Sequence, residues 1–137
     1  MYIYYNPNPR GHNVGDCTVR AISKVLEQTW EETYAGISAM GYYLCDMPSA
    51  NHVWGAYLRR KGYERVIVDD HGRDDYTVND FCKEHPKGKY VLAISGHVVC
   101  VIDGNYYDSW DSGNEIPLYK WRLESGTSSN MDKGGTR

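Results

Sequence analysis

The sequence of 137 residues contains no long apolar run and no block of basic residues. Its apolar stretches are far shorter than the roughly 20 residues that a membrane-spanning helix needs. Its first residues also lack the charged segment and apolar run of a signal peptide. We therefore expect a soluble cytoplasmic protein that makes no membrane contact. The 15 basic and 18 acidic residues are scattered, with a net charge of -3, so a nucleic-acid partner is not expected either.

Closely spaced cysteines are also missing. The four cysteines, at positions 17, 45, 82 and 100, form no Cys-x-x-Cys pair, which argues against a zinc knuckle or a thioredoxin-like redox site. The acidic loop at 69–75 offers carboxylates but lacks the spacing of an EF-hand, so we expect no metal site and no cofactor. Phenylalanine occurs once, against 13 tyrosines and 4 tryptophans, and tyrosines of this kind are typical of half-buried sheet positions.

The hydrophobic pattern changes from helical spacing in the first half of the chain to strand-like apolar runs in the second. Helices are predicted at 17–28, 29–41 and 49–62, with a short fourth helix at 77–83. Strands are predicted at 2–5, 63–68, 90–95, 97–102, 106–110 and 119–123, the first of them at a sheet edge. This order indicates one α+β domain over residues 1–124, with N-terminal helices packed on a C-terminal antiparallel sheet. The tail at 125–137 has almost no large apolar residues and is predicted to be disordered.

Cys17 stands at the first turn of the first predicted helix, with Asp16 as its expected N-cap. Backbone N–H groups and the helix dipole favour negative charge at such a position, and both stabilise the thiolate, which is the reactive form of cysteine. Free cysteines are also among the most buried residue types, so Cys17 can equally be a small core residue. The choice between these interpretations depends on whether the chain supplies a base. The other three cysteines are expected to be structural.

Among the five histidines, His97 is the best candidate for that base. It opens a strongly apolar strand, where a polar ring needs either a function or a satisfied place in the core. The turn signal Asp103-Gly104 predicts a tight hairpin, in which Asp108 lies diagonal to His97 on the same face. A three-residue turn would instead bring Asp111 opposite His97. Hairpin parity favours Asp108 and leaves Asp111 open.

Three motifs together resemble the papain-like cysteine peptidases: Gly15-Asp16-Cys17 opening a helix, Gly96-His97 opening a strand, and Asp108-Ser109-Trp110 after a hairpin. The order of cysteine, histidine and a third Asn or Asp is the order of that family, whose third residue lies in a similar Asn-Ser-Trp motif. The acidic third residue and the Asp-Cys pair are similar to the bacteriocin-processing branch, and the chain resembles small phage or bacterial members. The likeness covers roughly residues 10–112 in layout.

The resemblance implies a papain-like fold and a thiol hydrolase that cleaves a peptide or amide bond of a peptide or protein substrate through an acyl-enzyme. Cys17 would be the nucleophile, His97 the general base and later acid, and Asp108 would orient the imidazole. The family's upstream glutamine is missing, so Asn13 is the candidate side chain that joins the Cys17 N–H in an oxyanion hole. The negative charge of Asp16 beside the thiol opposes formation of the thiolate, unless the Asp16 side chain turns away into the helix cap or pairs with Arg20.

Two alternatives to hydrolysis remain open at this point. The same triad serves acyl transfer or deamidation, because water and amines compete for one thioester. A binding or inhibitor module that keeps the fold without the activity belongs to a different class of function, and it would tolerate Cys17→Ala.

Overall fold

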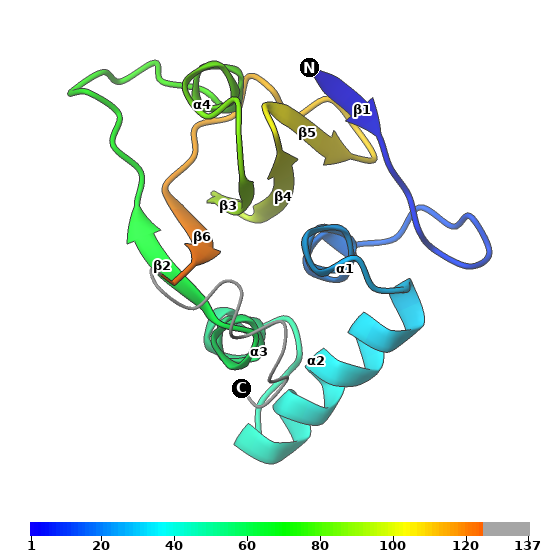
Figure 1. Ribbon diagram of the computed structural model, residues 1–137. Coiled ribbons are helices and arrows are strands. Elements are labelled where there is room, and N and C mark those ends of the chain that lie inside the picture. Colours follow the sequence, from blue (N-terminus) through cyan, green and yellow to red (C-terminus); the bar gives the residue numbers. More distant parts are fainter. Residues whose placement is uncertain (125–137) are drawn as a thin grey trace.

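Three helices in the first half of the chain cover one face of a sheet, and a fourth lies on the other face (Figure 1). The computed structural model describes residues 1–124, so the disorder predicted at 125–137 lies outside the described residues. The helices in the described part are α1 (Cys17–Leu26), α2 (Trp30–Leu44), α3 (Asn51–Arg60) and α4 (Val78–Glu84). None of these helices has the length and hydropathy of a membrane span.

The sheet has six strands in the described residues and is mixed, which corrects the prediction of an antiparallel sheet. Its strands are β1 (Tyr2–Tyr4), β2 (Tyr63–Ile67), β3 (Lys89–Ile94), β4 (His97–Ile102), β5 (Asn105–Asp108) and β6 (Tyr119–Leu123), in the order β1-β5-β4-β3-β6-β2. Every pair is antiparallel except β1 with β5. No hairpin joins these two strands, because the helices lie between them in the sequence, and so a turn does not set their relative direction.

The β4–β5 hairpin has the predicted two-residue turn. Ile102 pairs with Asn105, and both turn residues, Asp103 and Gly104, have positive φ angles of 49° and 80°. Such angles are typical of the tight turns that match the twist of the flanking strands. This register places His97 and Asp108 on the same face of the hairpin, as predicted from the sequence. The strand ends at Asp108, earlier than predicted.

The ends of the helices differ from the predictions where packing overrides the local signal. The capping box of α2 is present, since Thr29 and Glu32 exchange both expected hydrogen bonds. The helix continues past Gly41, however, to Leu44, and its C-cap residue Cys45 has a left-handed conformation. A Cβ at Gly41 would lie 2.7 Å from the carbonyl oxygen of Asp46, so this glycine allows a close approach of the following loop and does not end the helix.

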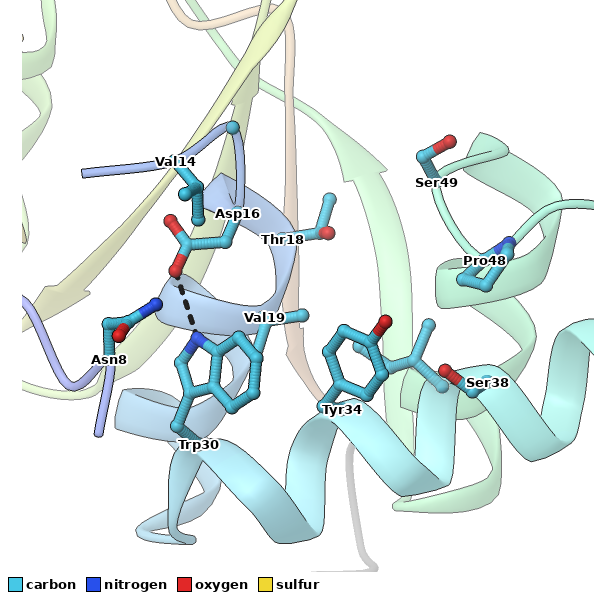
Figure 2. A pocket seen from close by; sticks show the side chains of 12 residues that line it. Asn8, Val14, Asp16, Thr18, Val19, Trp30, Tyr34, Ser38, Pro48 and Ser49 are labelled. Atoms are coloured by element: carbon cyan, nitrogen blue, oxygen red, sulfur yellow. Dashed lines mark hydrogen bonds between the residues drawn. The ribbon is translucent and has the colours of Figure 1, made fainter. Parts of the chain in front are cut away.

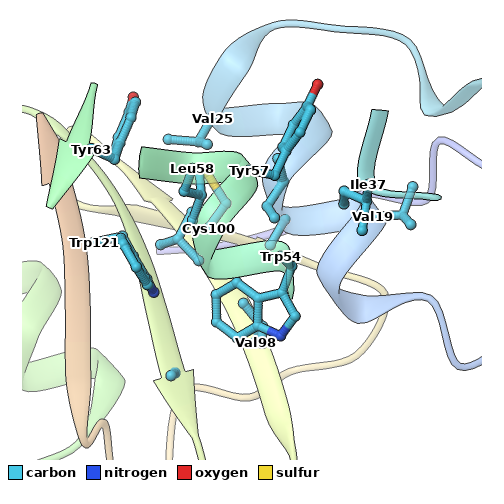
Figure 3. Packing of buried hydrophobic residues seen from close by; sticks show 14 of the residues in the cluster. Val19, Val25, Ile37, Trp54, Tyr57, Leu58, Tyr63, Val98, Cys100 and Trp121 are labelled. Atoms are coloured by element: carbon cyan, nitrogen blue, oxygen red, sulfur yellow. The ribbon is translucent and has the colours of Figure 1, made fainter. Parts of the chain in front are cut away.

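Two apolar clusters hold the helices on the sheet and thereby position the start of α1. On one face, Val19, Ile22 and Val25 of α1 pack against Val98 and Cys100 of β4 (Figure 3). On the other face, the second cluster joins α4 to alternate residues of β3 and β4. Because α1 lies directly on β4, its N-terminus comes beside the N-terminus of that strand. Cys17 and His97 are the first residues of these two elements.

Candidate active site

Cys17 is half-buried at the first position of α1. Asp16 occupies the N-cap position, as predicted. Its side chain makes no capping hydrogen bond, however, which corrects the expected role of Asp16 as a side-chain cap. Its Oδ1 accepts a hydrogen bond from Arg20 Nη1 at 2.5 Å, and its Oδ2 accepts one from Trp30 Nε1 at 2.9 Å. Both carboxylate oxygens of Asp16 are therefore paired, one with the charge of Arg20 and one with an indole N–H. The positive end of the helix dipole remains directed at Cys17.

His97 is linked to Asp108, the partner that hairpin parity favours. Its Nε2 lies 2.6 Å from Oδ2 of Asp108, whose side chain is fully buried. The alternative carboxylate, Asp111, accepts hydrogen bonds from the Tyr106 hydroxyl and from the Gly113 N–H. With Nε2 bound to Asp108, the Nδ1 atom of His97 is the ring nitrogen left for the thiol of Cys17.

The Asp108 carboxylate is held at both oxygens. Oδ1 accepts from the Ser109 N–H at 2.8 Å and from Arg20 Nη2 at 3.1 Å, while Oδ2 also accepts from Ser112 Oγ at 2.7 Å. Burial raises the pKa of this carboxyl, but the hydrogen bonds with His97 and Ser112 outweigh it and hold the pKa below its usual value. Asp108 is therefore a carboxylate at neutral pH, with a fixed orientation.

The pKa values of Cys17 and His97 shift in opposite directions. Burial raises the pKa of the Cys17 thiol, but hydrogen bonding to His97, the His97 charge, the Val98 N–H and Arg20 together bring it below the usual value. Burial disfavours the protonated ring of His97, yet hydrogen bonds with Asp108 and Cys17 raise its pKa to about 9. The proton shared by the pair accordingly favours the imidazole over the sulfur, which gives a thiolate and an imidazolium.

The buried cysteines elsewhere in the chain have the opposite character. Burial raises the pKa of Cys82 to about 11, and it raises the pKa of the fully buried Cys100 further still. Cys100 alternates with His97 along β4, as its parity predicted, and it packs beneath α1. Cys17 thus combines a lowered pKa with a histidine partner, and these two buried thiols do not.

Three contacts of Asp108 and His97 were not predicted from the sequence. Arg20 joins Asp108 to Asp16, Ser112 hydrogen-bonds Asp108, and the Trp110 ring lies against the His97 ring with centroids 4.7 Å apart. Pairing with Arg20 was one of the two arrangements considered for Asp16, beside capping of the helix, and the structure has the pairing. Contacts across 88 residues, such as that of Arg20 with Asp108, leave no local signal in the sequence.

The Cys17 thiol lies in a cleft formed by two neighbouring cavities. Two cavities, of about 420 and 470 Å³, are both lined by Gly15, Cys17, Gly96 and His97. The smaller one extends between α1, the start of α3 and the β3–β4 turn, and the larger one extends toward Trp110. A substrate chain can therefore approach Cys17 from either side.

Two amide side chains line this cleft. Asn13, the predicted oxyanion donor, lies along the larger cavity, and Asn51 lies along the smaller one. The Oδ1 atom of Asn51 accepts a hydrogen bond from the Trp54 indole at 3.2 Å. Asn13 therefore has a position compatible with its predicted role, in the same cavity as Cys17 and His97.

The acidic loop at 69–75 is occupied by internal contacts. Asp69 and Asp70 accept hydrogen bonds from the backbone of the loop, and Arg73 pairs with Asp75. Within residues 1–124, no group of three or more histidine, cysteine or acidic side chains is placed to hold a metal ion. A thiol, an imidazole and a carboxylate in contact, as in Cys17, His97 and Asp108, are the groups that nucleophilic catalysis by cysteine requires.

No protein-family model, curated protein or solved structure matches this chain.

Proposed function

We propose that this protein is a papain-like thiol hydrolase that cleaves a peptide or amide bond through an acyl-enzyme. The observation that carries the proposal is the position of His97, which interacts with the Cys17 thiol on one side and with the buried Asp108 carboxylate on the other. Perturbed pKa values of this kind, in a cleft and with a specific charge partner, are typical of functional sites. A helix-borne cysteine facing a strand-borne histidine also supports the papain-like resemblance.

The proposed reaction begins with the proton of the Cys17–His97 pair on the imidazole. The thiolate attacks the substrate carbonyl carbon and forms a C–S bond, which moves negative charge onto the carbonyl oxygen. The Cys17 N–H and the Asn13 side chain donate to this oxyanion. His97 then protonates the leaving amine as the C–N bond breaks, which leaves a thioester and a neutral imidazole.

The second half of the reaction releases the acyl group. Neutral His97 takes a proton from a water molecule, whose oxygen attacks the thioester carbonyl. The C–S bond breaks, the carboxylic acid leaves, and Cys17 returns to the thiolate beside a protonated His97. Asp108 keeps the imidazole in one orientation throughout, because it holds Nε2 while Nδ1 exchanges protons. An amine in place of water gives acyl transfer through the same steps.

Alkylation of the native protein at neutral pH, with limiting iodoacetamide and mapping by mass spectrometry, tests the proposal. Cys17 should be labelled faster than the exposed Cys45, and this advantage should disappear in His97→Ala. Cys45 serves as the internal control, because it reports thiol reactivity without a histidine partner of this type. Labelling of Cys17 at or below the rate of Cys45 would contradict an activated nucleophile.

Turnover of a fluorogenic peptide mixture separates an enzyme from a binding module. Cys17→Ala should abolish cleavage, and Cys45→Ala should leave it unchanged. Cleavage that survives Cys17→Ala would overturn the assignment of the nucleophile.

A further inference from the structure

A third cavity, of about 380 Å³, lies beside the start of α1, and six of the twelve residues that line it have apolar or aromatic side chains (Figure 2). We call it the Trp30–Tyr34 pocket, because these two rings of α2 stack with centroids 4.9 Å apart and form one wall. Its other apolar walls come from Val14, Val19, Ile37 and Pro48. The proposed catalytic steps leave this pocket unused.

The pocket offers no free charge to a ligand. Asp16 is the one acidic or basic side chain among the described residues that line it, and its carboxylate is held by Arg20 and Trp30. The indole N–H of Trp30 is the only polar atom of that ring, and the bond to Asp16 satisfies it (Figure 2). A charged ligand group would lose its hydration here without gaining a partner of opposite charge. An uncharged apolar group loses nothing of this kind.

The rim and size of the pocket suit one large side chain. Val14 and Tyr34 are each 52% exposed at its edge, so a ligand would remove apolar surface of both from water. The volume of about 380 Å³ is near the lower end of the roughly 300–1,000 Å³ that small-molecule pockets span. Aromatic and large aliphatic side chains match that shape and chemistry.

The Trp30–Tyr34 pocket adjoins the cleft that contains the thiol. Gly15, Thr18 and Ser49 line both this pocket and the cavity of about 420 Å³ at Cys17. Thr18 follows Cys17 directly and Gly15 precedes it by two residues. A peptide whose carbonyl lies at Cys17 therefore brings its neighbouring side chains close to this pocket.

We propose that the Trp30–Tyr34 pocket is the specificity subsite of this protein and binds an aromatic or large aliphatic side chain of a peptide, next to the bond under attack. This inference rests on the proposed thiol hydrolase function and names its substrate class. Acidic or basic side chains are disfavoured at that position, because the one charged group in the lining, Asp16, is already paired.

Labelling of the full chain with peptidyl acyloxymethyl ketones tests the inference. The probes are N-acetyl dipeptides in which each of the two positions is varied among Phe, Leu, Gly, Asp and Lys. At one of the two positions, Phe or Leu should label Cys17 roughly tenfold or more faster than Asp or Lys. Tyr34→Ala should reduce this preference, and Ser38→Trp, which places a bulky ring in the pocket, should abolish it.

Tyr43→Ala is the matched control, since Tyr43 is an exposed tyrosine of the same helix that does not line this pocket. It should leave the preference intact. Iodoacetamide labelling of Cys17 in every variant separates the two proposals, because this small reagent does not need the pocket. Selective iodoacetamide labelling without a side-chain preference overturns the subsite alone. A preference that survives both Tyr34→Ala and Ser38→Trp does the same, and loss of selective iodoacetamide labelling in the unmodified chain overturns the hydrolase function.

Discussion

The substitution Arg20→Met tests the buried charges behind the nucleophile. Charges alternate along the chain of contacts Asp16, Arg20, Asp108, His97 and Cys17. Arg20 is 4% exposed, and its two terminal nitrogens lie 2.5 Å from Asp16 and 3.1 Å from Asp108. Methionine fills similar space but supplies no cation, so two buried carboxylates lose their shared partner.

The expected loss of stability is large. Removing one member of a buried ion pair costs about 3–5 kcal/mol, because the remaining charge stays desolvated. A typical domain has about 5–15 kcal/mol of stability in total, so the variant should unfold at a much lower urea concentration. Arg73→Met is the control: Arg73 pairs with Asp75 at 3.1 Å but its side chain is 45% exposed. Exposed pairs contribute about 0–1 kcal/mol. Tryptophan fluorescence in urea measures both variants.

A second measurement separates a role at the site from a purely structural one. The charge of Arg20 lowers the pKa of both Cys17 and Asp108. In Arg20→Met the pKa of Cys17 should rise, so the acidic limb of the pH–rate profile for Cys17 alkylation should move to higher pH. Arg73→Met should leave this profile unchanged.

Two results would refute this reasoning. One is an Arg20→Met variant that is as stable as Arg73→Met, and the other is a folded Arg20→Met variant whose alkylation profile matches that of the unmodified chain. If Arg20→Met does not fold, the double variant Asp16→Asn/Arg20→Met should recover part of the stability. It removes one of the two buried carboxylate charges that lose Arg20 as their partner. Absence of any recovery would contradict the charge argument.

Three further predictions concern the base, the oxyanion donor and the fold. The pKa of His97 is raised from 6.5 to about 9, so its protonated ring stabilises the fold fully below pH 6.5, and this contribution is lost as the pH rises through about 9. The unfolding free-energy difference between the unmodified chain and His97→Gln should shrink over that range in urea titrations, and a constant difference would contradict the shift. Asn13→Ala should lower peptide turnover by roughly 10²–10³, and the control Asn51→Ala should not; the reverse result would assign the donor to Asn51. Gly41→Ala should cost about 1–3 kcal/mol in urea unfolding, because the added methyl meets the Asp46 carbonyl at 2.7 Å, and an unchanged midpoint would argue against that approach.

Interactions between residues a few positions apart in the chain were predictable from the sequence. The Thr29–Glu32 capping box needs only four consecutive residues, and both of its hydrogen bonds are present. The Asp103-Gly104 turn is equally local, and it determines the register of the β4–β5 hairpin. The placement of His97 near Asp108 follows from that register, and so does the choice of Asp108 over Asp111.

Features that depend on distant segments were not readable in this way. The second helix passes Gly41 because the loop at 46–48 packs against it, which a local helix-stop signal does not show. The N-terminal strand pairs in parallel with β5, although the sheet was predicted to be antiparallel. No turn connects these two strands, so no local signal sets their relative direction. In both cases, tertiary packing outweighs the preference of the local sequence.

The features of the candidate site fall into the same two groups, local ones that the sequence predicts and long-range ones that it does not. By itself, the sequence determined the helix start at Cys17 and the His97–Asp108 hairpin geometry, because each depends on local signals of known spacing. It left the Asp16 side chain two places, in the helix cap or against Arg20, and the structure has the second. Only the tertiary structure decided that α1 lies on β4, that Arg20 reaches Asp108 across 88 residues, and that Trp30 and Tyr34 enclose a pocket beside the thiol. The physical reason is that these contacts arise when α1 and α2 bury their apolar faces against the sheet and against each other. Burial of that kind is non-directional and selects partners by shape across the whole fold.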